Sequence, residues 1–273
     1  MDNEDDSVGT ILGRRRLLWY MGGAGIGLMA LRHGLVEAHS TVACVVSPES
    51  IEGPYYLDER LERSNLRIDP SNNQPVDGLP LDLLLNIGQV QGNVCRPLPG
   101  AIVDVWQCDA AGEYSGVDDH IIGFNNLGKG FLRGYQRSDS RGQVRFQSIY
   151  PGWYHGRCVH IHVKVRTSTP RFPNYEFTSQ LYLDEATTDK VHAMQPYSRK
   201  SHRDFTHEQD VFFTKLDGRQ MLLGLQPLRG GGYQGTLNIG LDLSDAKAAG
   251  SDAWKLDPLN PANNPGLLPK PPR

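Results

Sequence analysis

The chain has 273 residues, and its 28 basic and 31 acidic residues are mixed along the sequence to a formal net charge of -3. This near balance leaves no basic patch for nucleic acid or an anionic membrane surface, so a small molecule is the predicted partner. The 30 glycines and 18 prolines, beside an apolar fraction of 38%, indicate many turns and short strands rather than a helical bundle.

The first 40 residues differ from the remainder of the chain. An acidic start leads into the run Gly13-Arg14-Arg15-Arg16 and then into an uncharged apolar stretch that ends at residue 31. This order is typical of a twin-arginine export signal, and the stretch is shorter than the roughly 20 residues that a spanning helix needs. Residues 1–40 are therefore predicted to direct export to the periplasm or the exterior, with no stable membrane span after processing. An uncleaved anchor or a basic amphipathic start is the alternative.

The four cysteines, Cys44, Cys95, Cys108 and Cys158, have spacings that match no zinc pattern. In an exported chain two or more of them can oxidise to disulfides. The sequence does not determine how they pair.

Residues 79–255 are predicted to form an all-β domain, an antiparallel β-sandwich with long loops. Apolar and polar residues alternate there in short runs separated by turn residues, as they do in such sandwiches. The predicted strands cover residues 81–90, 101–106, 143–149, 159–166, 178–183 and 236–243. A short helix is expected over residues 185–194, with Asp184 as its N-cap.

Three segments flank or interrupt these strands. Residues 41–78 form an N-terminal extension with the motif Glu52-Gly53-Pro54-Tyr55-Tyr56, and residues 116–133 form a loop rich in Gly and Asn. Residues 256–273 form a Pro-rich tail whose composition cannot bury a core, so an extended tail is expected.

The stretch over residues 151–165 holds the densest set of candidate functional residues. Its second half, read as a strand, places His160, His162 and Lys164 on one face and the intervening apolar residues on the other. Two imidazoles that point the same way from a strand form half of a metal site. Lys164 and Arg166 are poor ligands, so the remaining ligands must come from elsewhere in the chain.

Two tyrosines lie in constrained settings near this strand. Tyr154 belongs to a Pro-Gly-Trp-Tyr turn, and Tyr114 follows the strand that ends at Trp106. A phenol has a pKa near 10, so only a strongly Lewis-acidic ion such as Fe(III) displaces its proton readily. Two phenolates and two imidazoles suit ferric iron better than zinc. The alternatives are a non-catalytic binding module and a zinc or copper protein that adds His155 or His120 to the His pair.

Together these motifs resemble the intradiol ring-cleavage dioxygenases, and most closely their compact branch, which is similar to the protocatechuate 3,4-dioxygenase β chain. The resemblance covers roughly residues 44–183 and rests on the order and spacing of segments 52–56, 100–115, 151–165 and 178–180. It implies Fe(III) as the cofactor, with Tyr114, Tyr154, His160 and His162 as its ligands. The helical dimerisation region of catechol 1,2-dioxygenases has no evident counterpart between residues 40 and 79, which argues against that branch.

The same resemblance implies cleavage of a catechol-type ring by O2 to a muconate-type diacid. Tyr154 would be the axial phenolate that leaves the metal and takes a proton from the diol. Arg157 would stabilise the negative charge that builds on the ring, and Gln180 would help to position it. The sequence leaves open the role of His155, the identity of the catechol and whether the protein is an oligomer.

Overall fold

The computed structural model describes residues 45–120, 122–167 and 175–244, so the predicted signal segment and Pro-rich tail lie outside it. In chain order the described elements are β1 (Ile68–Asp69), β2 (Gln74–Pro75), β3 (Pro80–Gln91), β4 (Val94–Pro97), β5 (Ile102–Trp106), β6 (Asp118–Asp119), β7 (Phe124–Asn125), β8 (Arg133–Arg137), β9 (Gln143–Ile149), β10 (His160–Thr167), β11 (Tyr175–Tyr182), α1 (Glu185–His192), η1 (Tyr197–Arg199), α2 (Val211–Lys215), η2 (Gly218–Met221), β12 (Gly224–Pro227) and β13 (Tyr233–Leu241).

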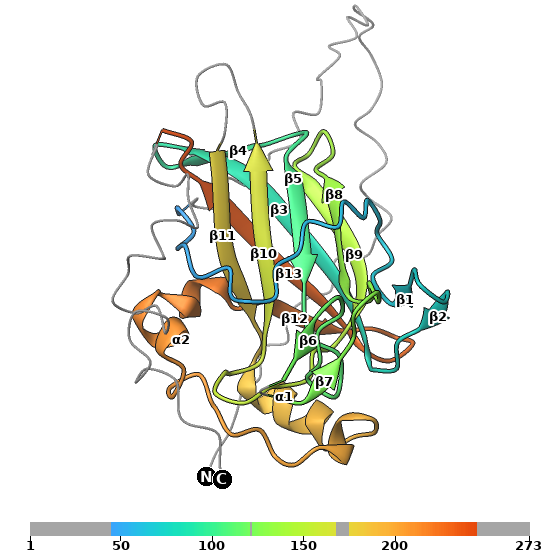
Figure 1. Cartoon of the computed structure of the whole chain (residues 1–273). Helices are drawn as coiled ribbons and strands as arrows, with labels where there is room; N and C mark the ends of the chain where they lie inside the picture. The colour runs from blue at the N-terminus through green and yellow to red at the C-terminus, as the bar shows by residue number, and fades with distance from the viewer. Residues whose placement is uncertain (1–44, 121, 168–174, 245–273) are drawn as a thin grey trace, which may run out of the picture. The chain divides into compact units, whose positions relative to one another are not determined.

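Most strands belong to two sheets, which are seen in Figure 1. The first has the order β11-β10-β5-β8, and the second has the order β12-β13-β3-β4, with β9 also paired to β3. The pairings within both sheets are antiparallel except that of β13 with β3, which runs parallel from Tyr233 opposite Leu81 to Leu241 opposite Gln89. The predicted sandwich is confirmed, with one parallel pair that the alternation of residues does not reveal.

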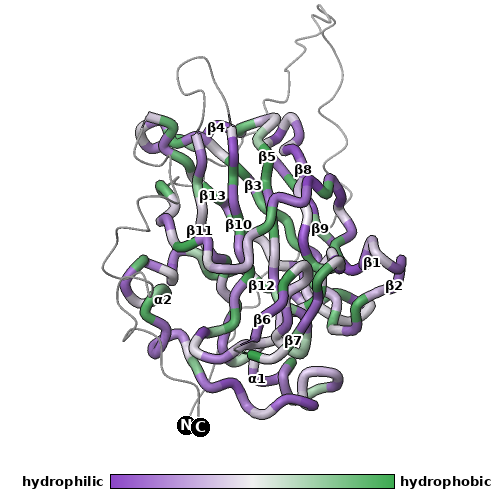
Figure 2. Tube along the Cα trace, viewed as in Figure 1, coloured by the Kyte–Doolittle hydropathy of each residue, from purple (hydrophilic) through white to green (hydrophobic). Residues whose placement is uncertain are grey.

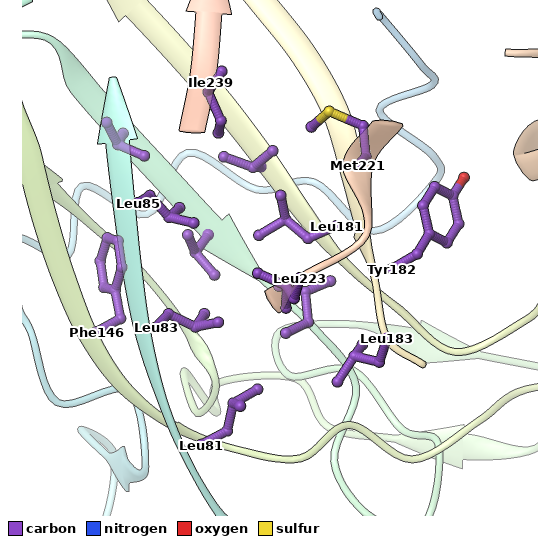
Figure 3. Packing of buried hydrophobic residues seen from close by; sticks show 14 of the residues in the cluster. Leu81, Leu83, Leu85, Phe146, Leu181, Tyr182, Leu183, Met221, Leu223 and Ile239 are labelled. Carbon is purple, nitrogen blue, oxygen red and sulfur yellow. The ribbon is translucent and has the colours of Figure 1, made fainter. Parts of the chain in front are cut away.

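The core lies between the two sheets and follows from the alternation along each strand. On β3, every second side chain from Leu81 to Ile87 is at most 1% exposed. These side chains share one apolar cluster with residues of the other sheet, such as Val163 and Leu181, and Figure 3 shows part of this packing. Each fully buried Leu or Ile stabilises the fold by about 1.5–3 kcal/mol. In Figure 2 hydrophobic residues recur along β3 and β5, whereas the β1–β2 hairpin is mostly hydrophilic.

The predicted strands coincide with or overlap β3, β5, β9, β10, β11 and β13. The predicted helix is α1, and Asp184 caps it by accepting a hydrogen bond from the Thr187 N–H at 2.8 Å. The loop over residues 116–133 contains the short β6–β7 hairpin and the first residue of β8. The sequence prediction omits β1, β2, β4, β8, β12 and α2, besides the short β6 and β7 and the two 3-10 helices.

Strand β10 is buried on both faces, because the segment over residues 45–63 crosses the outer face of its sheet (Figure 1). Ser50 N–H donates to the carbonyl of Thr178 on β11 at 2.9 Å, and the ring of Tyr56 lies 4.9 Å from that of Trp106 on β5. Further along, Arg63 N–H donates to the carbonyl of Tyr135 on β8 at 3.0 Å. The extension is thus part of the packed structure and covers the predicted ligand face.

Lys164 fixes this covering segment to the sheet. Its side chain is 3% exposed, and its ammonium group pairs with Glu52 of the segment and with Glu176 of β11. The same ammonium lies 4.5 Å from the centre of the Tyr56 ring. A buried ammonium is stable only when such partners replace water.

Cys95 is disulfide-bonded, whereas Cys108 and Cys158 are free thiols in the interior. Cys44 lies outside the described residues. No helix in the described part of the chain has the length and apolar character needed to span a membrane.

Replacing Lys164 with Met removes the cation that Glu52 and Glu176 share. We expect the free energy of unfolding to fall by about 2–3 kcal/mol, toward the low end for a broken buried pair because both glutamates are partly exposed. Urea unfolding measures this change. The control is Arg141→Met, which removes a positive charge from the exposed pair of Arg141 with Asp139. The Arg141 side chain is 71% exposed, so its loss should change the free energy of unfolding by less than about 0.5 kcal/mol. Equal midpoints for the two variants would contradict the role of Lys164.

Candidate metal centre

The four predicted ligands come together at the end of the first sheet where β10 begins. His160 and His162 are alternate residues of β10, Tyr154 lies in the turn between β9 and β10, and Tyr114 lies in the loop after β5. All four are buried, with exposed fractions of 0% for Tyr114, 9% for Tyr154, 2% for His160 and 1% for His162. Tyr154 is therefore the member of the set with most access to solvent.

Their polar atoms converge. Tyr154 Oη lies 3.2 Å from His160 Nε2, which lies 3.1 Å from His162 Nε2. The Tyr114 ring centre lies 5.7 Å from that of Tyr154 and 6.2 Å from that of His162. Tyr114 Oη is buried and has no hydrogen-bond partner within the described residues. Two nitrogens and two phenol oxygens thus share one small interior region.

Two turns bring the tyrosines together. Gly152 N–H, in the Pro-Gly-Trp-Tyr turn, donates to the Asp109 carbonyl at 3.0 Å. A Cβ atom on Gly152 would lie 2.3 Å from that carbonyl oxygen, so only glycine permits this approach. Asp109 also organises the loop of Tyr114, since its Oδ1 accepts from the N–H groups of Ala111 and Glu113 at 2.9 and 3.0 Å.

Strand register places the neighbours of His162. Trp106 of β5 and Gln180 of β11 lie directly opposite His162 on its two sides, and directly opposed residues share a face of the sheet. The Trp106 ring stacks on the imidazole at 4.8 Å with an interplanar angle of 7°. Gly53 of the covering segment packs directly against His162. Its φ is +75°, and a Cβ atom at this position would lie 3.2 Å from His162 Cε1. Because residue 53 is a glycine, the Gly-Pro-Tyr-Tyr motif can lie close to the His162 imidazole.

Tyr55 of the same motif supports Tyr114. The two rings stack at 4.4 Å and 22°, and Tyr55 Oη donates to Asp119 Oδ2 at 2.6 Å. Arg133 is 3% exposed and donates to Ser115 Oγ at 2.8 Å and to the Tyr55 carbonyl at 3.1 Å. Arg133 thus connects the segments that carry Tyr55 and Ser115 through hydrogen bonds of its buried guanidinium.

Burial sets the protonation states of the ligands. It raises the pKa of Tyr154 to about 12 and that of Tyr114 well above its ordinary value, so both phenols keep their protons at neutral pH without a metal. Burial, followed by the charge of Arg157, lowers the pKa of His160 well below its ordinary value, and burial likewise lowers the pKa of His162. Both imidazoles are neutral, which is the form that binds metal ions.

The hydrogen bonds also orient one imidazole as a ligand. His160 Nδ1 lies 2.7 Å from the Cys158 carbonyl, which only accepts, so Nδ1 carries the proton and Nε2 keeps its lone pair. The two Nε2 atoms lie 3.1 Å apart, close enough for both to bind one ion at the usual metal–nitrogen distance of about 2.1 Å. No group of three His, Cys, Asp or Glu in the described ranges could hold a metal, so an ion here requires the phenol oxygens. The donor set fits a hard, strongly Lewis-acidic cation such as Fe(III).

Arg157 and Gln180 lie beside this set in a network of buried polar groups. Arg157 Nε donates to Asp210 Oδ2 at 2.8 Å, and its Nη2 donates to Gln180 Oε1. Gln180 Oε1 also accepts from Tyr182 Oη at 3.0 Å, while its amide nitrogen donates to the Ile51 carbonyl at 3.3 Å. Although burial alone would lower the pKa of Arg157, the Asp210 carboxylate raises it above its ordinary value, so this residue is a permanent cation.

The other candidates from the sequence do not join the cluster. His155 turns to Asp204 and pairs with its carboxylate. The His120 side chain is 87% exposed and lies 3.5 Å from Asp118. The geometry therefore gives no support to a metal site that adds His155 or His120 to the His pair.

The sequence prediction misses Asp210, and it gives Tyr55 no role. A local signal exists for Asp210, because an acidic residue before the apolar run Val211-Phe212-Phe213 is a helix N-cap pattern. That signal predicts a cap and not a contact with Arg157, 53 residues earlier. Tyr55 stands in a motif that carries the family resemblance, but its stacking on Tyr114 depends on how the extension folds back.

A buried set of two tyrosines and two histidines thus lies at the end of a β-sandwich, and comparisons with known proteins identify the family of the chain. A family model described as Dioxygenase matches residues 51–196. The chain is 30% identical over 157 residues to catechol 1,2-dioxygenase 2 of Acinetobacter lwoffii. This match covers 50% of this chain and 51% of that protein. The chain is 26% identical over 172 residues to chlorocatechol 1,2-dioxygenase of Pseudomonas putida, with 55% and 60% covered. The chain thus spans only about half of the first of these relatives.

A solved structure gives the longer match. The intradiol ring-cleavage dioxygenase from Tetranychus urticae superposes with a TM-score of 0.61 at 30% identity, over 73% of this chain and 96% of that one. The chain belongs to the intradiol ring-cleavage dioxygenase family, which confirms the family inferred from the motifs. The closer likeness to the protocatechuate branch stays a prediction.

Replacing His160 or His162 with Ala should abolish iron binding, because each removes one of the converging nitrogen donors. Iron per chain after loading and desalting measures this. The matched controls are His155→Ala and His120→Ala, which should keep the iron content of the unsubstituted protein. Iron lost from His155→Ala, or kept in either His160→Ala or His162→Ala, would contradict the ligand set.

Proposed function

We propose that the protein is an Fe(III)-dependent enzyme that opens catechol-type diols between their two hydroxyl-bearing carbons, adding both atoms of O2 to give a muconate-type diacid. The observation that carries this proposal is the convergence of Tyr114, Tyr154, His160 and His162 around an unpaired buried phenol oxygen. Membership of the family supports the reaction class. The names of two relatives, a catechol and a chlorocatechol 1,2-dioxygenase, support small catechols as the substrate class.

Bound at these four residues, a ferric ion would supply the Lewis acidity that makes a diol reactive toward O2. The chain's own residues handle the protons. Tyr154 is the ligand with most exposure, 9% against at most 2% for the other three, so it is our candidate for the group that accepts a proton from the incoming diol. In the metal-free protein Tyr154 Oη lies 3.2 Å from His160 Nε2, so the protonated phenol stays next to the position that the ion would take.

Arg157 and Gln180 would act on the charge of the substrate. Arg157 remains protonated in a buried site, where a fixed cation interacts strongly with negative charge that develops on the ring. Gln180 accepts from Arg157 Nη2 and lies opposite His162 on the sheet. In this arrangement Gln180 positions the guanidinium and acts on the substrate through it.

The visible spectrum of the iron-loaded protein tests the proposal. We expect a tyrosinate-to-iron band that shifts when a catechol is added without oxygen, and on admitting isotopically labelled O2 both labelled atoms should appear in a diacid product. Tyr154→Phe should lose part of the band and slow turnover at least about a hundredfold, the lower end of what general acid–base assistance contributes. The control is Tyr135→Phe, at a half-exposed tyrosine of β8, which should change neither.

One outcome would overturn this function, and a second would overturn the role of Tyr154. A colourless protein after iron loading would leave a non-catalytic binding module as the better reading. An unchanged band in Tyr154→Phe would remove that residue from the ligand set.

We also propose that the protein is exported through the twin-arginine route, which carries folded proteins and suits a metal centre assembled before transport. The proposal rests on the sequence of residues 1–40, which lie outside the described structure.

Replacing Arg14 and Arg15 together with Lys keeps the charge but removes the arginine pair. In a bacterial host with this pathway, we expect the double variant to accumulate in the cytoplasm, as measured by fractionation and immunoblotting. Arg16→Lys is the matched control and should be exported. Equal export of the double variant would exclude the twin-arginine route.

A further inference from the structure

Asp210 lies outside the residues matched by the family model, 51–196, yet its side chain is fully buried against Arg157. It comes from the start of α2, which lies beside the end of the sheet where β10 begins (Figure 1). A buried carboxylate requires partners for both oxygens. The identity of those partners indicates what the residue does.

The two carboxylate oxygens of Asp210 accept hydrogen bonds from different parts of the chain. Oδ2 accepts from Arg157 Nε at 2.8 Å and from the Cys158 N–H at 3.0 Å, so it holds both the guanidinium and the backbone that leads into His160. Oδ1 accepts from the N–H groups of Phe212 and Phe213 at 2.8 and 3.2 Å, which caps α2. One carboxylate therefore ties the helix to the turn that carries Tyr154.

The guanidinium is held from its face as well as from its edge. The Phe212 ring centre lies 4.4 Å from Arg157 Cζ, a cation–π distance. Nε is engaged by Asp210 and Nη2 by Gln180, whereas Nη1 has no hydrogen-bond partner within the described residues. The Arg157 side chain is 6% exposed, so one edge of an otherwise fixed guanidinium is left for a ligand.

We propose that Asp210, with Phe212, is the positioning residue for Arg157 and holds its Nη1 where it can donate a hydrogen bond to an oxygen of the bound diol or of the product anion. The inference rests on the proposed function and deepens it. A guanidinium fixed on one edge and one face loses little conformational freedom when it binds a ligand, so positioning raises affinity for the diol. Asp210 does not contact the substrate itself.

The test compares Asp210→Asn, Arg157→Met and the double variant. Asn keeps the helix cap, since it is as good an N-cap as Asp, but it removes the charge that orients Arg157. The readout that needs no turnover is the binding of 4-nitrocatechol to the iron-loaded protein without oxygen, followed by its visible spectrum. Iron content and the tyrosinate band report whether the metal site is intact.

We expect Asp210→Asn to keep its iron and its band but to bind 4-nitrocatechol about tenfold more weakly, the loss of roughly one charge-assisted hydrogen bond. The double variant should bind no more weakly than Arg157→Met alone, because Asp210 acts through Arg157. Phe212→Leu, which keeps an apolar side chain but removes the aromatic ring, should weaken binding about threefold by the loss of the cation–π contact. If Asp210→Asn does not fold, the 4-nitrocatechol affinity of Phe212→Leu tests whether Arg157 must be positioned.

Normal 4-nitrocatechol binding by Asp210→Asn or, if that variant is unfolded, by Phe212→Leu would overturn the positioning role. So would losses that multiply in the double variant, since they would mean that Asp210 acts independently of Arg157. Failure of the proposed function looks different. In that case the unsubstituted protein itself would lack the band or would not bind 4-nitrocatechol.

Discussion

The burial of β10 on both faces is the constraint on which the rest of the structure depends. One face is apolar and packs in the sandwich core, while the other carries His160, His162 and Lys164 beneath the segment over residues 45–63. Buried polar groups destabilise a fold unless they are paired. Lys164 meets two glutamates, and His160 meets a backbone carbonyl and Tyr154. Tyr114 Oη has no such partner in the described structure, and a bound cation would provide one.

The sequence predicts the parts of this arrangement that are local. Alternation identifies β3, β5, β9 and β10, and Asp184 marks the start of α1, because these signals depend on neighbouring residues. The parallel pairing of β13 with β3 joins residues about 150 positions apart, so no local pattern encodes it. The same reason hides the salt bridge between Arg157 and Asp210 and the stacking of Tyr55 on Tyr114. That Tyr114, Tyr154, His160 and His162 lie together was predictable, because the spacing of the His pair and the order of the motifs can be read along the chain.

The part of the chain beyond residue 196 is integral to both the core and the site. Ile239 and Leu241 of β13 are fully buried in the main cluster, and α2 brings Asp210 and Phe212 to Arg157. A family model that ends at residue 196 therefore describes the four ligands but not the groups that hold the neighbouring arginine.

The charges around the ligands explain why an arginine near the metal needs an anion beside it. Without metal, the two phenols and two imidazoles are neutral, and Arg157 with Asp210 sums to zero. A ferric ion on two phenolates would leave one net positive charge. A buried guanidinium beside that charge stays ionised only with an anion next to it, because charges in a buried site are weakly screened. Asp210 keeps Arg157 ionised and in place, so the guanidinium would attract an anionic diol while the four ligand residues hold the metal.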